Sequence, residues 1–225
     1  MSAFLEANAK LISMMKTGLI ETVQMTLFST LFAYILGIPL GVLLVVTEKG
    51  HIRENPVLNQ AVGTVVNVLR SIPFLIMILM LFPLTRIVMG TALGVRAAIF
   101  PLVIAAFPYV ARMIESSLKE VDSGVIEAAQ SMGSSTMQII FKVMLPEAVP
   151  SLINGAAISM TTILGYTAMA GAVGAGGLGK IAIDYGMYRY DYTTLYAASI
   201  LLVLLVQIIQ IAGTKIALAV DRRRR

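Results

Sequence analysis

Three observations predict an all-α integral membrane protein with about five transmembrane helices. The 225 residues are 58% hydrophobic and only 13% charged, and their mean hydropathy is +0.87. These values are too apolar for a soluble domain of this length. The apolar residues form long runs, and a helix needs about 20 such residues to cross a bilayer. Only the segment between the third and fourth runs is long and charged enough to lie outside the membrane.

The spans are expected within a single transmembrane domain that covers residues 1–225. By apolar length they lie at about residues 18–46, 57–84, 97–114, 152–170 and 194–212, with a loop at 119–146. Residues 1–17 are expected to form a short interfacial helix or a loose arm. Gly37 and Gly41 flank Pro39 in the first span. This pattern favours either close helix approach or a simple kink.

The charged segment from Asp122 to Pro150 is predicted to form two helices joined at Gly133. Ser123 is expected to cap the first helix, and Gly133 suits the left-handed position that ends it. Four small or apolar residues would share one face at the helical period: Val125, Ala128, Ala129 and Met132.

The second helix of this segment is expected to begin at Ser135. Ser135 and Gln138 have the spacing of a capping box. Pro146 and Pro150 are expected to break the helical pattern before the fourth span. The segment then amounts to a helical hairpin between two membrane spans.

Residues that could support catalysis or metal binding are scarce. There is no cysteine, and His51 is the single histidine, in a charged loop without partners at ligand spacing. No pair of carboxylates lies within a span, so an enzyme is not expected. Arg70 stands between two apolar runs, which suggests either an interior position or a side chain that extends to lipid headgroups.

A glycine-rich stretch matches two nucleotide-binding patterns by its letters but lacks the flanking features that these patterns require. Gly174–Lys180 fits both G-x-G-x-x-G and G-x-x-x-x-G-K. A phosphate loop needs Ser or Thr after the lysine and a buried strand before the first glycine. Ile181 follows the lysine, and a membrane span precedes the stretch. The glycines are therefore expected to allow a tight turn or close backbone packing.

Basic residues predict the orientation in the membrane. The chain ends in Arg222–Arg225, which favours a cytoplasmic C-terminus. Five spans then place the N-terminus outside and the loop at 119–146 in the cytoplasm.

The charged loop also carries a family resemblance. Glu127-Ala128-Ala129, followed by Gly133 and Leu145-Pro146, resembles the EAA loop of the membrane subunits of ABC importers. Four segments further resemble the permease subunit of bacterial methionine importers: Arg70–Phe74, Ala128–Gly133, Leu145–Ala148 and Gly171–Gly179. The resemblance covers residues 18–215.

The resemblance implies an ATP-driven importer of methionine, located in the inner membrane of a bacterium. Two copies of the chain would form the pathway, two cytoplasmic ATPase subunits would bind ATP and magnesium, and an outer lipoprotein would deliver methionine. No cofactor is expected on this chain. The residues implied in coupling to the ATPase are Val125, Glu127, Ala128, Ala129, Met132 and Gly133.

Methionine import also suggests what could line the pathway. A thioether side chain suits an apolar, adaptable lining, which methionine residues provide, and each of them can equally fill a core. The candidate pathway residues are Arg70, Met77, Met160, Thr161 and Met169, with Met80 as a further methionine.

Two other hypotheses remain open on the sequence. The first is an ABC importer permease for another small amino acid or a short peptide. The second is an ion-coupled carrier, which predicts acidic residues in mid-span and an inverted repeat. The sequence contains neither feature.

Overall fold

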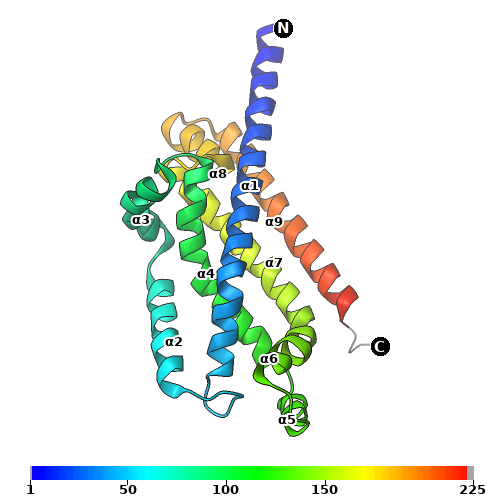
Figure 1. Cartoon of the computed structure of the whole chain (residues 1–225). Helices are drawn as coiled ribbons and strands as arrows, with labels where there is room; N and C mark the ends of the chain where they lie inside the picture. The colour runs from blue at the N-terminus through cyan, green and yellow to red at the C-terminus, as the bar shows by residue number, and fades with distance from the viewer. Residues whose placement is uncertain (1, 222–225) are drawn as a thin grey trace. The chain divides into compact units, whose positions relative to one another are not determined.

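The computed structural model describes residues 2–221, with side chains from residue 9 onward, and these residues form helices without any strand (Figure 1). The tail at Arg222–Arg225 lies outside the described residues. The elements in order are α1 (Ser2–Val46), α2 (Pro56–Ser71), α3 (Phe74–Met89), α4 (Val95–Lys119), α5 (Ser123–Ser131), α6 (Thr136–Ile139), η1 (Ile140–Met144), α7 (Leu145–Ala170), η2 (Gly171–Val173), α8 (Gly177–Ile183), η3 (Asp184–Tyr188) and α9 (Tyr192–Val220).

Four helical stretches are long and apolar enough to cross a membrane. They are Ala9–Val46, Val95–Lys119, Thr136–Val173 and Tyr192–Val220. Helices α2 and α3 pass the same test only as a pair, broken at Ile72 and Pro73. The described residues therefore hold four candidate spans, or five if the broken pair counts as one.

Two helices continue where the sequence suggested separate elements. Residues 2–17 belong to the same helix as the first span, because α1 runs unbroken to Val46. Helix also continues from Thr136 to Ala170, so Pro146 and Pro150 do not separate the hairpin from the fourth span. Pro146 is the second residue of α7, so its missing N–H falls at the junction between α7 and the helical turn before it. The wide π-helical turn η1 directly precedes it and gives the backbone room to adapt.

The chain divides into two compact units, each built from segments that are distant in sequence. The first unit comprises Met1–Leu31, Pro73–Ala105 and Met160–Ile209. Its core includes Met15, Leu178, Ala182 and Ala198. The Phe74 and Tyr166 rings stack with centroids 4.6 Å apart, which joins the start of α3 to α7.

The second unit comprises Phe32–Ile72, Ala106–Ser159 and Gln210–Arg225. Here the small residues of α1 allow close packing against α4. A Cβ atom on Gly41 would lie 2.6 Å from the carbonyl oxygen of Ala111, and one on Gly37 would lie 2.6 Å from a Val110 methyl group. Close helix approach is thus confirmed as a role of this glycine pair.

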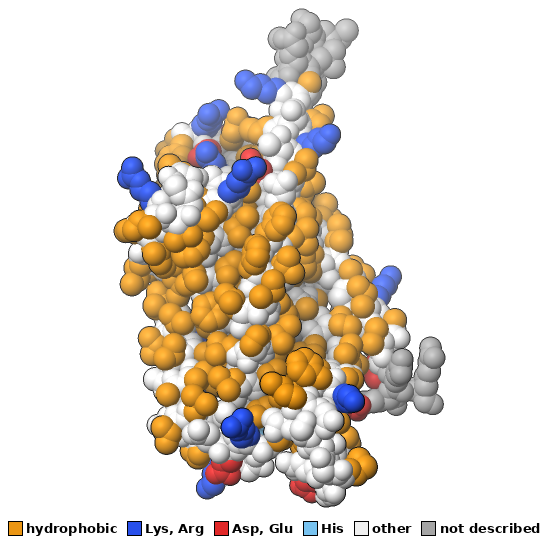
Figure 2. Space-filling model, viewed as in Figure 1, with side chains coloured by type: hydrophobic (Ala, Val, Ile, Leu, Met, Phe, Trp, Pro, Cys, Tyr) orange, Lys and Arg blue, Asp and Glu red, His pale blue; other side chains and the backbone are white. Residues whose placement is uncertain are grey.

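Large apolar side chains remain exposed along the candidate spans (Figure 2). Leu27 and Phe28 of α1 are each 49% exposed, and Ile208 of α9 is 63% exposed. Figure 2 shows hydrophobic side chains along the visible helix surfaces and most charged side chains toward the helix ends. Such surfaces are stable when lipid tails cover them.

Candidate functional site

Helix α5, in the loop between α4 and α7, is the candidate coupling helix (Figure 1). Its N-cap is Asp122, whose carboxylate accepts a hydrogen bond from the backbone N–H of Gly124 at 2.7 Å. The expectation that Ser123 is the cap was wrong by one residue, because Ser123 is already helical. Asp and Ser are about equally good caps, so composition does not choose between neighbours.

The apolar residues of α5 divide between two directions. Ile126 and Ala129 are 7% and 3% exposed, and α5 contacts α6 and η1 of its own chain. Val125 is 45% exposed, Met132 is 79% exposed, and Ala128 is also exposed. The predicted single face was therefore wrong in one member, since Ala129 faces inward while the other three face outward. Residues Val125, Ala128 and Met132 form an apolar face that the chain itself leaves uncovered.

The turn after α5 has the geometry that the sequence predicts. Gly133 has φ +77°, and a Cβ atom there would meet nothing within 4 Å. Only the left-handed backbone requires glycine at this position. Ser135 and Gln138 form a capping box, with 2.8 Å between the Ser135 nitrogen and the Gln138 side-chain oxygen. Glu127 lies exposed on α5.

An ion network holds the end of α4, from which the chain leads into α5. The Lys119 ammonium lies 2.8 Å from Glu48 and 3.0 Å from Glu115. The Glu115 carboxylate also lies 2.6 Å from the Arg112 guanidinium, which donates to the Asn67 side chain at 2.9 Å. The network therefore ties α4 both to α2 and to the loop after α1. It fixes the end of α4, which directly precedes α5 in the chain.

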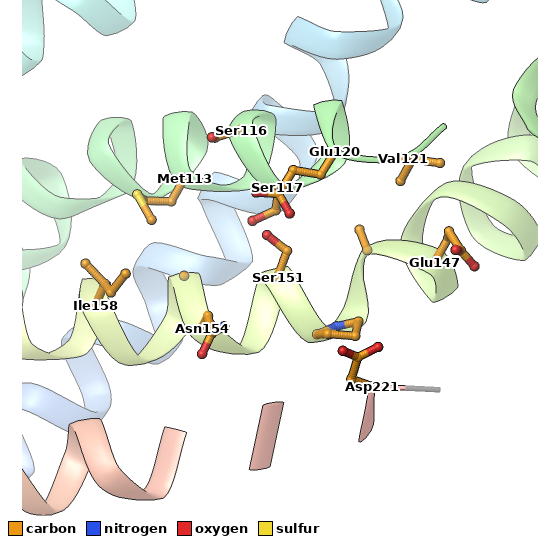
Figure 3. Close-up of a pocket in the computed structure, with 13 residues that line it drawn as sticks. Met113, Ser116, Ser117, Glu120, Val121, Glu147, Ser151, Asn154, Ile158 and Asp221 are labelled. Carbon is orange, nitrogen blue, oxygen red and sulfur yellow. The ribbon is translucent and has the colours of Figure 1, made fainter. Parts of the chain in front are cut away.

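A polar cavity of about 370 Å³ lies between the end of α4 and the start of α7 (Figure 3). Ser117 and Ser151 point toward each other across it. The Ser117 residue is only 3% exposed. The other polar residues that line the cavity are Ser116, Glu120, Glu147, Asn154 and Asp221. Among the described residues that line the cavity, three are acidic (Glu120, Glu147 and Asp221) and none is basic.

The candidate pathway residues fall into different environments. Met77 is 4% exposed in the core of the first unit, Met160 and Thr161 are half-buried, and Met169 is 53% exposed. Met160 and Met169 are nine residues apart on one helix, so they lie about 180° apart around it and do not share a face.

Arg70 belongs to the second unit and lies in the last turn of α2. Its side chain is exposed. Arg70 lies directly before the break between α2 and α3, a position that is compatible with both of the roles that the sequence left open for it.

The glycine-rich stretch forms a packed turn rather than a phosphate site. The backbone N–H groups of Gly177 and Leu178 donate to Glu21 at 2.7 Å and to the Thr22 hydroxyl at 2.9 Å. These are the amides at the start of α8 that a phosphate would need. Gly176 and Gly177 have φ of +101° and +76°, which explains glycine at both positions.

Comparison with known proteins gives the family. The model of the family described as "binding-protein-dependent transport system inner membrane component" matches residues 17–225. The chain belongs to this family. Its fold is therefore that of a transport permease, and the coupling-loop resemblance falls within the matched residues.

Several relatives of this permease are called D-methionine transport system permeases. The probable permease MetI of Vibrio cholerae is 49% identical over 203 residues, which cover 90% of each chain. MetI of Escherichia coli K12 is 47% identical over 154 residues, which cover 68% of this chain and 71% of that one.

Solved structures agree with these relatives. A structure described as an inward-facing conformation of the MetNI methionine ABC transporter matches with 46% identity and a TM-score of 0.94. The match covers 95% of this chain and 99% of that one. An amino acid ABC transporter crystallised with histidines matches with 19% identity and a TM-score of 0.66, which shows the shared fold alone.

The polar cavity of this permease was missed at the level of sequence, although a signal exists. Glu147, Ser151 and Asn154 follow one another at spacings of four and three, which places them on one side of a helix. The signal was hidden because the fourth span was expected to begin at residue 152, after this stripe had started.

Proposed function

We propose that this chain is the permease subunit of an ATP-driven methionine importer. The observation that carries the proposal is the uncovered apolar face of α5, formed by Val125, Ala128 and Met132. The high similarity to permeases that are called methionine transporters supports the cargo. The chain itself performs no chemistry, and ATP and magnesium bind to separate ATPase subunits.

Helix α5 couples the permease to an ATPase by lying in a groove on its surface. Val125, Ala128 and Met132 are spaced as the anchors of a helix-in-groove contact. Ile126 and Ala129, on the neighbouring side of α5, are buried in the chain's own structure, where α5 contacts α6 and η1, so α5 moves together with these two elements. Gly133 lets the chain turn back directly after the contact, and Glu127 lies exposed where it can meet a basic group.

The permease acts as a homodimer with two ATPase subunits and an outer methionine-binding lipoprotein. Each chain contributes about five spans, and identical chains pair most often around a two-fold axis. The mass of the solubilised complex tests this assembly. One permease chain for two ATPase subunits would contradict it.

The N-terminus lies outside and the C-terminus in the cytoplasm. This orientation places α5 on the side where ATP is available. Single cysteines at Ser2 and Ser134 can be probed on intact cells with an impermeant thiol reagent. Labelling at position 2 alone supports the orientation, whereas labelling at position 134 alone refutes it.

The coupling role is tested with variants of α5 in reconstituted vesicles that contain the ATPase and the binding protein. Ala128→Asp and Met132→Asp place a charge in the proposed contact and should lower methionine uptake at least ten-fold, the effect of losing about 1.4 kcal/mol of interaction. Gln130→Asp is the matched control, because it adds the same charge to α5 outside that face. Ala129→Asp is unsuitable, since burial of the new charge would disrupt α5 itself.

Two measurements distinguish the coupling role of α5 from the identity of the transported molecule. ATP hydrolysis and uptake of labelled methionine are measured on the same vesicles. If Ala128→Asp and Met132→Asp transport at the rate of Gln130→Asp, α5 is not the coupling helix. If the unmodified complex hydrolyses ATP but accumulates no methionine, the cargo is another small molecule.

A further inference from the structure

A groove of about 720 Å³ lies in the second unit, between the last part of α1, the start of α2 and the α6–η1 segment. Its walls are mostly apolar and include Ile38, Val42, Val46, Leu58, Met137 and Phe141. Met137 and Phe141 are 66% and 64% exposed, so the described chain does not cover them. The size is within the roughly 300–1,000 Å³ of ligand sites in proteins.

The polar residues of this groove come mostly from the loop after α1. Glu54 accepts a hydrogen bond from the Gly50 N–H at 2.9 Å, and Asn55 accepts one from the Leu58 N–H at 3.1 Å. Thr47 donates to the Leu43 carbonyl at 2.7 Å and accepts from Asn59 at 3.1 Å. These three side chains are already engaged within the protein.

Arg53 is the basic residue that lines the groove, and it differs from these neighbours. Its guanidinium is exposed and has no hydrogen bond or ion pair among the described residues. The loop that carries it is nevertheless ordered, because the Arg53 backbone N–H bonds to the Val46 carbonyl at 3.1 Å and that of Asn55 bonds to the Thr47 carbonyl at 2.9 Å. The groove thus joins long apolar walls to one cation held in place at the loop.

We propose that this groove binds one phospholipid with an anionic headgroup. An acyl chain lies against the apolar walls, and the phosphate accepts hydrogen bonds from Arg53. Both walls belong to candidate spans, Ala9–Val46 and Thr136–Val173, so lipid tails reach them directly. Unpaired basic groups between membrane helices select anionic headgroups over zwitterionic ones.

The apolar walls argue against a free phosphate as the occupant. A phosphate ion would use the Arg53 guanidinium and leave the exposed Met137 and Phe141 side chains uncovered. A lipid can both pair with the Arg53 guanidinium and cover the apolar walls, because it carries a charged group and a hydrocarbon chain in one molecule. The proposal does not depend on which substrate the permease transports.

The test measures lipid retention by native mass spectrometry on the purified permease complex, equilibrated with equal amounts of phosphatidylglycerol and phosphatidylcholine. The unmodified protein should retain phosphatidylglycerol in preference. Arg53→Gln should reduce that preference about five-fold, the effect expected for one basic residue near an anionic surface. Lys49→Gln is the matched control, because this exposed lysine of the same loop does not line the groove.

A second variant tests the apolar walls. Phe141→Ser removes an exposed ring and should reduce the retention of both lipids without changing the preference between them. Equal preference in Arg53→Gln and Lys49→Gln would overturn the proposal. Displacement of phosphatidylglycerol by inorganic phosphate, together with full retention by Phe141→Ser, would overturn it in favour of a phosphate site.

Discussion

The carboxylate of Glu21 in α1 accepts a hydrogen bond from the backbone N–H of Gly177 at 2.7 Å, although 156 residues separate them in the sequence. Thr22 makes the same kind of bond to Leu178 one position later. Together they satisfy two of the N–H groups at the start of α8 that have no partner within the helix. These bonds fasten the glycine-rich stretch to α1. It resembles a phosphate loop in sequence only, because its amides are bonded to α1 and cannot bind a phosphate.

Replacing Glu21 should loosen this turn. Glu21→Ala removes the side-chain acceptor and leaves the Gly177 N–H without its partner, which should lower the free energy of unfolding by about 1–3 kcal/mol. Thermal unfolding of the solubilised protein measures the change. Gln24→Ala, at an exposed position of the same helix, should be close to neutral. Equal stability of the two variants would show that the bond contributes nothing.

Two glycines should respond very differently to alanine. A Cβ atom on Gly179 would collide with the backbone of Ala168, so Gly179→Ala should prevent the fold from forming and abolish recovery of the inserted protein. Gly90 has φ +76° but meets nothing within 4 Å, so Gly90→Ala carries only the left-handed backbone cost of about 1–2 kcal/mol. Yield and melting temperature after membrane extraction compare them. Normal recovery of Gly179→Ala would contradict the tight packing of α7 against α8.

The ion network at the end of α4 should matter for stability. Glu115 is 8% exposed and pairs with both Arg112 and Lys119. Glu115→Gln keeps the shape but removes the charge, and leaves two cations without their shared partner. The expected loss is about 1–3 kcal/mol, below the value for a fully buried pair because Lys119 is partly exposed.

A neighbouring carboxylate is the control for Glu115. Glu120 is exposed directly after α4 and takes no part in the network, so Glu120→Gln should change the melting temperature little. Indistinguishable melting of the two variants would mean that the network is only a surface arrangement.

Asp191 should make the start of α9 sensitive to acid. Hydrogen bonds from the Thr194 hydroxyl and backbone, and then from the Thr193 backbone, hold the pKa of Asp191 below its usual range. A lowered folded-state pKa means that the contribution to stability is present above the unfolded pKa and is lost as the pH falls through the folded one. The stability difference between the unmodified protein and Asp191→Asn should therefore be full at neutral pH and shrink below about pH 4. Melting curves at neutral and acidic pH measure it, and a difference independent of pH would contradict the assignment.

The sequence by itself determined the features that depend on short stretches. Apolar runs long enough for a bilayer established the helical membrane class, because the lipid forces the backbone to bond within each span. Gly133 and the Ser135–Gln138 capping box followed from local backbone requirements within a few residues. The family resemblance came from the same loop and from two other short segments, Arg70–Phe74 and Gly171–Gly179.

Only the tertiary structure decided which surfaces are covered. Ala129 and Ala128 are adjacent and chemically identical, yet one is buried against its own chain and the other is exposed, because the position of α6 and η1 decides it. The bond between Glu21 and Gly177 and the polar cavity beside Ser117 depend on residues far apart in the sequence. Burial and hydrogen bonding between distant segments arise from packing. Local periodicity can place Glu147, Ser151 and Asn154 on one side of a helix, but it does not tell which distant segment faces them.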